Sequence, residues 1–114
     1  MKYATIGFDG ATGNNSIVAA VTGQRIHVYG LLVQGGGNAN IIIRSGTAGT
    51  DHIGITGAAY PIGPTRRPLR LPRAASAWFE TDVGEALNMS VSGLGTDLSG
   101  LIVYDTTAGS GQNV

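Results

Sequence analysis

Turn-forming clusters break this chain so often that no uninterrupted stretch can form an amphipathic helix. Apolar residues do not recur at helical spacing without an intervening glycine or proline. Short runs that alternate apolar and polar residues, or that are rich in β-branched residues, lie between the clusters. Their spacing of about 8 to 12 residues is typical of sandwiches and barrels. We therefore expect an all-β protein.

The expected strands cover most of the chain up to Tyr104. They are residues 2–8, 16–21, 25–34, 40–45, 52–56, 69–71, 77–81, 86–92 and 98–104. Residues 57–68 hold three of the four prolines and should form an extended connection or a sheet edge, because proline cannot donate to a strand ladder. The predicted fold is a two-sheet antiparallel β-sandwich of the jelly-roll type, and an immunoglobulin-like sandwich is the alternative.

The length of 114 residues fits a single domain. We expect this domain to span residues 1–105. Residues 106–114 are small and polar, which predicts a flexible C-terminal tail.

Three local patterns predict details of the sandwich. Alternation in the strand at 25–34 would place its side chains on two faces, Ile26, Val28 and Leu32 on one and Arg25, His27 and Tyr29 on the other. The consecutive isoleucines at 41–43 predict a strand that is covered on both faces. The run Gly35–Asn38 predicts a hairpin turn, because glycine readily adopts positive φ angles.

The chain carries few charges. Only 12% of its residues are charged, about half the share of a usual soluble domain. Such a surface is weakly protected against association, so we expect much of it to be covered by other protein. Seven basic and seven acidic residues give a formal net charge of zero, so no overall field would attract nucleic acid or an anionic membrane. The absence of cysteine excludes disulfides and thiolate metal sites.

The sequence contains no recognisable catalytic or cofactor motif. The G-x-S-x-G nucleophile motif and the glycine patterns that bind nucleotides do not occur. His27 and His52 lack the ligand spacing of a zinc site; we expect His27 to be partly packed or at an interface, and His52 to be a surface turn residue. No nucleophile, base and orienting residue can be assembled from the sequence. We therefore expect neither an enzyme nor a cofactor.

Arginines and carboxylates gather in the region 66–85. Four of the seven basic residues are Arg66, Arg67, Arg70 and Arg73. Because a guanidinium group binds a carboxylate through two parallel hydrogen bonds, these arginines could pair across a subunit boundary with Glu80, Asp82, Glu85 or Asp105. A nucleic-acid patch and solvated edge charges that prevent aggregation are the alternatives.

The aromatic pair Trp78 and Phe79 lies in the same region. Both rings are expected to anchor either the core or a subunit interface. Trp78 beside Glu80 and Asp82 also resembles a sugar subsite, because a sugar ring can stack on an indole, so carbohydrate binding is an alternative. The candidate interface comprises Arg66, Arg67, Arg70, Arg73, Trp78, Phe79, Glu80, Asp82 and Glu85.

Several segments together resemble a known family. They are N-S-I-V-A-A-V-T-G-Q-R-I-H-V at 15–28, R-S-G-T at 44–47, A-W-F-E-T-D-V-G-E-A-L-N-M-S-V-S at 77–92 and L-I-V-Y at 101–104. This pattern resembles small virion structural proteins of tailed bacteriophages. The resemblance implies a compact β-sandwich that acts as a capsid decoration protein, with a tail or fibre-tip module that binds a receptor or carbohydrate as the alternative. Residues 63–73 are less typical of the pattern, and partner-specific contacts are expected there.

The resemblance also implies partners and a location. Decoration proteins commonly bind the head shell as trimers, so we expect a homotrimer that contacts the major capsid protein in the virion and is made in the host cytoplasm. No long apolar stretch follows Met1, and no apolar run reaches the roughly 20 residues of a membrane helix. We therefore expect no secretory signal and no membrane insertion. The zero net charge gives the further expectation that nucleic acid is not a partner.

Overall fold

The computed structural model describes residues 1–8, 13–47, 49–55, 57–64, 66–93 and 97–108. This part of the chain forms β-strands and no helix, so the all-β prediction is confirmed. The strands are β1 (Lys2–Phe8), β2 (Gly13–Val18), β3 (Gln24–Gly35), β4 (Ala39–Ser45), β5 (Asp51–Ile53), β6 (Tyr60–Ile62), β7 (Leu69–Leu71), β8 (Phe79–Glu80), β9 (Leu87–Ser92) and β10 (Leu98–Ala108).

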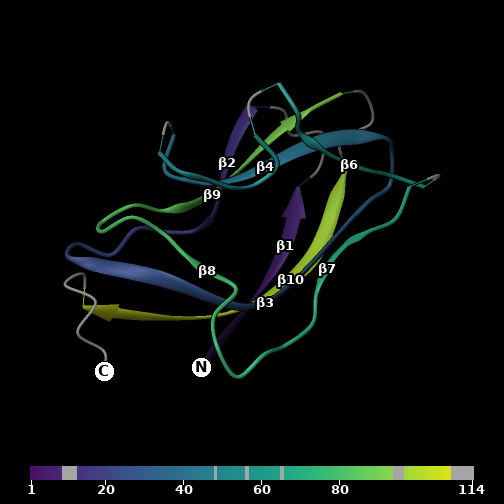
Figure 1. Ribbon diagram of the computed structural model, residues 1–114. Helices are drawn as coiled ribbons and strands as arrows, with labels where there is room; N and C mark the ends of the chain where they lie inside the picture. Colours follow the sequence, from purple (N-terminus) through teal and green to yellow (C-terminus); the bar gives the residue numbers. More distant parts are fainter. Residues whose placement is uncertain (9–12, 48, 56, 65, 94–96, 109–114) are drawn as a thin grey trace.

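The strands form two antiparallel sheets that pack against each other as a sandwich (Figure 1). Sheet A has the order β1-β10-β3-β7, and β8 also pairs with β3. Sheet B has the order β2-β9-β4-β5, and β6 also pairs with β4. Apart from the runs β4-β5-β6 and β7-β8, which each stay within one sheet, successive strands alternate between the sheets. This is the strand order of the predicted jelly roll, and not that of the immunoglobulin-like alternative.

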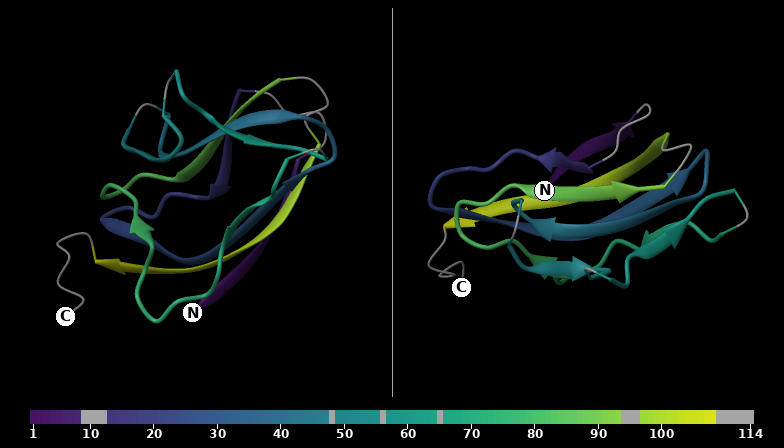
Figure 2. Two further views of the ribbon diagram at one scale, coloured as in Figure 1. Left: turned by 45° about the vertical axis from the view of Figure 1, so that its right-hand side comes forward. Right: turned by 90° about the horizontal axis from the view of Figure 1, so that it is seen from above.

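Each sheet has one edge strand that is interrupted by a loop. β10 pairs with one side of β3 along its whole length, so β7 and β8 share the other side and residues 72–78 leave the sheet between them. In sheet B, β5 and β6 share one side of β4 in the same way. Both interrupted edges lie on one side of the sandwich, opposite β1 and β2 (Figure 2).

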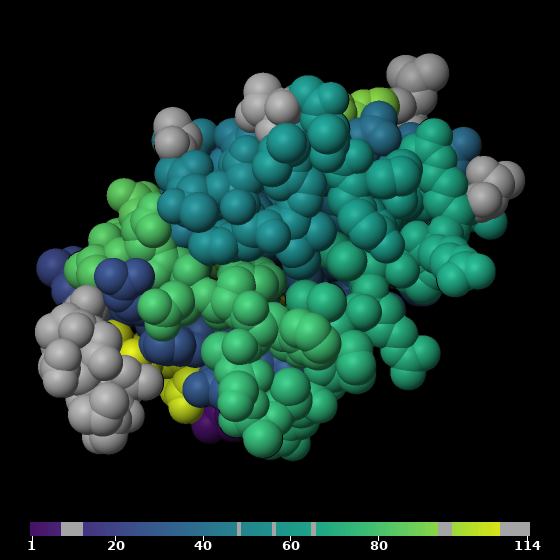
Figure 3. Space-filling model, in the orientation of Figure 1, coloured from purple at the N-terminus to yellow at the C-terminus, as the bar shows by residue number. Residues whose placement is uncertain are grey.

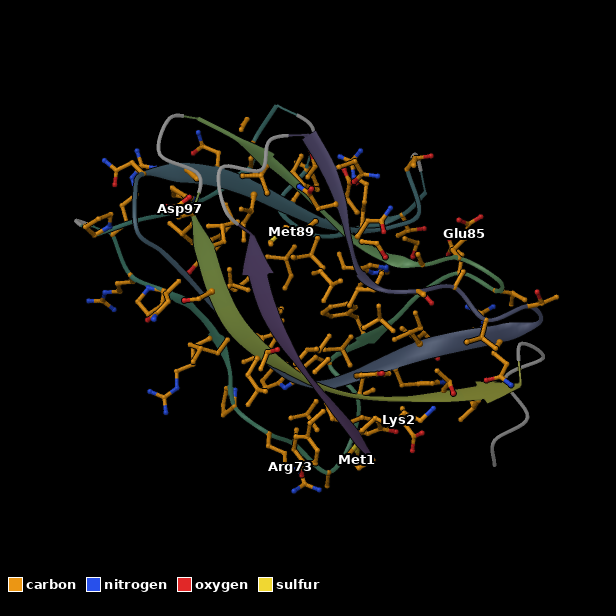
Figure 4. The ribbon with its side chains drawn as sticks, turned by 180° about the vertical axis from the view of Figure 1, so that it is seen from behind. Met1, Lys2, Arg73, Glu85, Met89 and Asp97 are labelled. Carbon is orange, nitrogen blue, oxygen red and sulfur yellow. The ribbon has the colours of Figure 1, made fainter. Side chains whose placement is uncertain are left out.

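The core lies between the sheets and is built of aliphatic side chains from both. Ile26 and Ile102 of sheet A and Ile43 and Met89 of sheet B are fully buried there. Met89 lies in the space between the two sheets (Figure 4). Alternating strand residues therefore supply the burial that stabilises the fold, as period-two patterning requires.

The isoleucine run of β4 is covered on both faces, as predicted. Ile41 and Ile43 belong to the core cluster. Ile42 points to the opposite face of sheet B and is nevertheless buried. Residues 57–59, in the loop between β5 and β6, line a hollow beside it.

A β-bulge in β3 corrects the predicted faces of that strand. Val103 of β10 pairs with Gly30, but its neighbour Tyr104 pairs with Val28, so Tyr29 is the extra residue. A bulge reverses the alternation that follows it. Ile26 and Val28 face the core as predicted, but Leu32 faces outward, and Leu31 and Val33 are buried in its place. The prediction that placed Leu32 with Ile26 and Val28 was wrong for this reason.

The prediction of a hairpin at Gly35–Asn38 was also wrong. β3 belongs to sheet A and β4 to sheet B, so these residues carry the chain from one sheet to the other. Among the described glycines with positive φ, none lies at positions 35–37. A Cβ atom on Gly35 would instead lie 2.7 Å from the carbonyl oxygen of Gly37, so the connection needs glycine for a close backbone approach.

The last strand is longer than expected. β10 continues to Ala108. Its pairing with β1 stops at Tyr104, but β3 continues to pair with it as far as Gln24. The predicted flexible tail from residue 106 is therefore corrected at 106–108, and residues 109–114 lie outside the described part. At the other end of the chain, β2 begins at Gly13 and ends at Val18, earlier than the predicted 16–21.

Candidate functional site

The outer face of sheet A, which points away from the core, is the most distinctive surface of the described residues. The bulge at Tyr29 divides it into two parts. We call the part formed by Tyr3, Leu32, Arg70, Leu101 and Val103 the apolar half. We call the part formed by Arg25, His27, Glu80, Asp105 and Thr107 the ionic half.

The apolar half contains a row of residues that crosses four strands. Thr5 of β1 pairs with Leu101 of β10, Leu101 pairs with Leu32 of β3, and Leu32 pairs with Arg70 of β7. Directly opposite residues in antiparallel strands lie on the same face of the sheet. Leu32 is 37% exposed and Leu101 is 41% exposed, so two large aliphatic side chains lie side by side in contact with solvent.

A hollow of about 200 Å³ lies beside this row. Its lining includes Leu32, Leu101 and Val103, with Arg70 and Arg73 at the side of β7. The guanidinium group of Arg73 donates a hydrogen bond to the hydroxyl oxygen of Tyr3 on β1, at 3.3 Å, and so reaches across β3 and β10. Figure 4 shows Arg73 on the outside of the sandwich near the N-terminal end of the chain.

Gly30 lies where β3 meets the loop that follows β7. It pairs with Val103 at the bulge, and a Cβ atom at this position would lie 3.4 Å from the Cα atom of Arg73. This distance is that of van der Waals contact, so the loop after β7 lies close against the backbone of β3 at the bulge. The loop thereby places Pro72 and Arg73 at one side of the hollow.

The ionic half is a connected network around His27. The side chain of His27 is only 7% exposed, and its Nδ1 atom lies 3.1 Å from a carboxylate oxygen of Glu80 on β8. Its Nε2 atom lies 2.5 Å from the hydroxyl of Thr107 on β10. Arg25 lies 3.7 Å from Glu80 and donates to the carbonyl oxygen of Thr81. The prediction that His27 is partly packed is confirmed.

The order Thr107, His27, Glu80 is that of a nucleophile, a base and an orienting carboxylate. The structure therefore brings together three side chains that the sequence alone does not identify as a set. Acyl transfer needs two further parts, a hollow that holds the acyl group at the hydroxyl and donors for the developing oxyanion. Neither the hollow beside Leu101 nor a second one on sheet B, lined in part by Ile42, includes any of these three residues. Because Thr107, His27 and Glu80 lie on three different strands, their contacts link β10, β3 and β8.

A second polar cluster joins the two sheets at their interrupted edges. The ring of His52 on β5 stacks on Phe79 of β8 with 4.7 Å between the ring centroids. Thr50 donates to the carboxylate of Asp82 from both its backbone nitrogen and its hydroxyl. The hydroxyl of buried Ser45 lies 2.9 Å from Nε2 of His52 and accepts the backbone N–H of Asp82. Figure 3 shows the teal and green segments around these residues in contact on one face.

His52 is therefore not the surface turn residue that was expected. Burial lowers the pKa of His52 below its ordinary value of 6.5, and the carboxylates of Asp82 and Asp51 offset part of this effect. This shift favours the neutral ring, which suits its half-buried place against Phe79. This cluster, like the ionic half, uses its polar groups inside the chain.

The structure separates the residues of the predicted interface. Glu80 contacts His27 and Arg25, Asp82 contacts Thr50, and Asp105 lies 3.6 Å from the amino nitrogen of Met1, so these carboxylates are engaged within the chain. Glu85 lies against Gly46, and Phe79 packs on the core. None of them is paired with an arginine of the 66–73 cluster.

The four arginines of that cluster also differ from one another. Arg66 donates to the carbonyl oxygen of Ala39, and Arg73 donates to Tyr3. Arg67 and Arg70 are exposed and form no hydrogen bond or ion pair with other described residues. Arg70 and Arg73 line the hollow, whereas Arg66 and Arg67 do not.

Trp78 lies outside the core. Its ring is 48% exposed, and its Nε1 atom donates to the carbonyl oxygen of Pro72 across the loop that interrupts the edge of sheet A. Of the two aromatic residues that were expected to anchor the core or an interface, only Phe79 packs against the core. Glu80 and Asp82 both contact partners within the chain.

The predicted interface did not include four residues of the apolar half, namely Tyr3, Leu32, Leu101 and Val103. A signal for them exists in the sequence, because Leu31-Leu32-Val33 and Leu101-Ile102-Val103 are consecutive apolar runs like that of Ile41–Ile43. Such runs place apolar side chains on both faces of a strand. Thr107 was missed because the tail was expected to begin before it.

The described residues include no group of three or more histidine, aspartate or glutamate side chains that could hold a metal ion. They also include no helix with the length and hydropathy of a membrane span. Comparisons with protein-family models, curated proteins and solved structures found no match to this chain.

Proposed function

We propose that this protein is a structural subunit that works by docking against other protein chains. The observation that carries the proposal is the apolar half of the outer face of sheet A. Leu32 and Leu101 form an exposed pair beside Arg70, which has no partner among the described residues. The two leucines are adjacent and not scattered singly, and contiguous apolar surface bordered by polar residues is the kind that a partner protein can cover.

The low share of charged residues supports the same proposal. Few charged residues are present to oppose association with other protein molecules. Most described carboxylates are already used in contacts within the chain. The resemblance to small virion proteins of tailed bacteriophages gives the proposal a specific form. In that form, the chain is a capsid decoration protein that binds the head shell, and it associates as a trimer.

The proposal is tested by incorporation of a tagged chain into the assemblies of its native source. Leu101→Asp places a charge in the centre of the apolar half and should prevent incorporation while leaving the chain folded. Val83→Asp is the matched control, because Val83 is also an exposed aliphatic residue but lies outside this face. Immunogold electron microscopy of the particles then shows whether the tagged chain decorates a phage head. Equal incorporation of both variants would contradict the proposal.

A second candidate is a receptor-binding or carbohydrate-binding module. The half-exposed indole of Trp78 favours it, because stacking on an aromatic ring is a common way to bind sugars. A glycan array tests this candidate directly. Binding that is lost in Trp78→Ala and kept in Leu101→Asp would favour it over the docking function.

A further inference from the structure

We propose that the apolar half of the outer face of sheet A binds an acidic, aliphatic segment of a partner protein. This inference rests on the proposed docking function and adds the chemistry of what docks. It is based on the exposed pair Leu32 and Leu101 next to the guanidinium groups of Arg70 and Arg73.

The guanidinium groups lack a carboxylate. Arg70 lies on β7 directly opposite Leu32 and forms no hydrogen bond or ion pair with other residues that the structure describes. Arg73 donates only to the neutral phenol of Tyr3 within the same part of the chain. A planar guanidinium fork is best matched by a carboxylate, which accepts two of its hydrogen bonds at once. The charge of this surface is therefore complementary to aspartate or glutamate.

The hollow between these groups is aliphatic. Leu32, Leu101 and Val103 line it, and the two arginines stand at one side. A leucine or isoleucine of a partner would cover this apolar surface, and a neighbouring carboxylate would reach the arginines. Burial of apolar area supplies affinity, and the charged rim supplies orientation.

A second copy of this chain offers few carboxylates for the role. Asp51 contacts Arg44, Glu80 contacts Arg25 and His27, and Asp82 contacts Thr50. Asp97 has a partner of its own, and Asp105 lies beside the amino group of Met1. Among the described carboxylates, this leaves Glu85 and also Asp82, whose hydrogen-bond partner Thr50 is neutral, and both lie against residues 46–50 of their own chain. A partner with its own acidic segment satisfies the surface better.

Nucleic acid also fits less well. Phosphate groups could bind the arginines, but a nucleic-acid backbone would leave Leu32 and Leu101 uncovered. Single-stranded bases bind by stacking on aromatic rings, and among the residues of the apolar half only Tyr3 has one.

The test is a titration of ¹⁵N-labelled protein with the acetylated, amidated peptide Asp-Leu-Glu-Leu-Asp, followed by NMR. Amide signals of β3, β7 and β10 around Leu32, Arg70 and Leu101 should shift, and the peptide Lys-Leu-Lys-Leu-Lys should cause no shifts there. The double variant Arg70→Ala with Arg73→Ala should weaken binding by about tenfold or more. Arg67→Ala is the matched control, because it removes an exposed, unpartnered arginine outside the hollow and should bind like the wild type. The spectra themselves show whether each variant is folded.

Three results of the NMR titrations would overturn the inference. They are an absence of shifts, shifts centred on Arg66 and Arg67, and equal binding of a single-stranded DNA oligomer to the same residues. Concentration-dependent dimerisation that Leu101→Asp abolishes would assign the surface to a second copy and also overturn it.

If the peptide fails to bind but Leu101→Asp still blocks incorporation into assemblies, the docking function stands and only the partner's chemistry is wrong. If Leu101→Asp is incorporated normally, the docking function itself fails.

Discussion

Arg25 and Arg70 lie on the same face of sheet A but in opposite surroundings. Arg25 contacts Glu80 and the carbonyl oxygen of Thr81, in a network where His27 is almost fully buried. Arg70 lies beside exposed Leu32 and has no partner among the described residues. The ionic half thus satisfies its polar groups within the chain, whereas the apolar half leaves both a charge and aliphatic surface to solvent. We infer from this difference a structural role for the ionic half, and our docking proposal concerns the apolar half.

The largest effect is expected from His27→Ala in the ionic half. The change removes both contacts of a buried ring and leaves Glu80 and Thr107 without it. It should lower the free energy of unfolding by about 2–3 kcal/mol. Denaturant unfolding measures this cost, and incorporation into assemblies should be unchanged under conditions where the variant is folded. A change in the free energy of unfolding near zero would show that the network does not stabilise the fold.

The next largest effect contrasts two neighbouring aromatic residues. Phe79→Ala removes a ring that packs on the core and stacks on His52, and should cost about 2 kcal/mol. Trp78→Ala removes a half-exposed ring and should cost less than about 1 kcal/mol. Thermal unfolding of both variants checks the order. Equal costs would show that Trp78 is packed in solution.

Thr107→Val replaces a hydroxyl by a methyl group of similar size. It should cost about 1 kcal/mol, because one hydrogen bond to His27 is lost. The same variant also tests whether this network has a structural role or is a reactive site. If a fluorophosphonate probe labels the wild type and fails to label Thr107→Val, the network is a reactive site and the division between the halves is wrong.

A smaller effect is expected from pH at the edge that joins the two sheets. Burial lowers the pKa of His52 in the folded chain, so the unfolded chain binds more protons in this range. The stability that comes from a neutral His52 is fully present above pH 6.5 and is lost as the pH falls through the folded pKa. His52→Asn should show a flatter pH dependence than the wild type below 6.5 in denaturant unfolding. A steeper loss in the variant would contradict the direction of this shift.

The smallest effect on stability is expected in the apolar half. Leu101→Ser and Arg70→Ala should each change the free energy of unfolding by no more than about 0.5 kcal/mol, because both side chains are exposed and Arg70 has no partner in the described chain. Their effect should appear in binding instead. A stability loss comparable to that of His27→Ala would mean that the two halves do not differ in role.

The sequence predicted the layers of this fold well because period-two patterning and glycine turns are local signals. The strands at Lys2–Phe8 and Leu69–Leu71 were predicted with their observed bounds. Leu32 was misplaced because a bulge depends on pairing with β10, which is more than sixty positions away in the sequence and leaves no local mark. The Gly35–Asn38 connection was misread because a turn and a crossing between sheets require similar residues.

The candidate site was predicted only in part for a related reason. Arg70 and Arg73 were identified from their charge, but their neighbours on the sheet come from β1, β3 and β10. Glu80 and Asp82 were assigned to an interface because their partners, His27 and Thr50, become neighbours only when the strands pair. Charge identifies a candidate, and pairing between strands decides whether it is used inside or outside the chain.

The most direct measurement is photo-crosslinking in the native source, with p-benzoylphenylalanine placed at position 101 in one chain and at position 16 in another. Leu101 lies in the apolar half, and Ser16 is an exposed residue of β2 in sheet B. A covalent product with one partner protein, rich in acidic and aliphatic residues at the linked peptide, is predicted from position 101 and not from position 16. Equal products from both positions, or none from position 101, would contradict the claim that the apolar half is a docking surface.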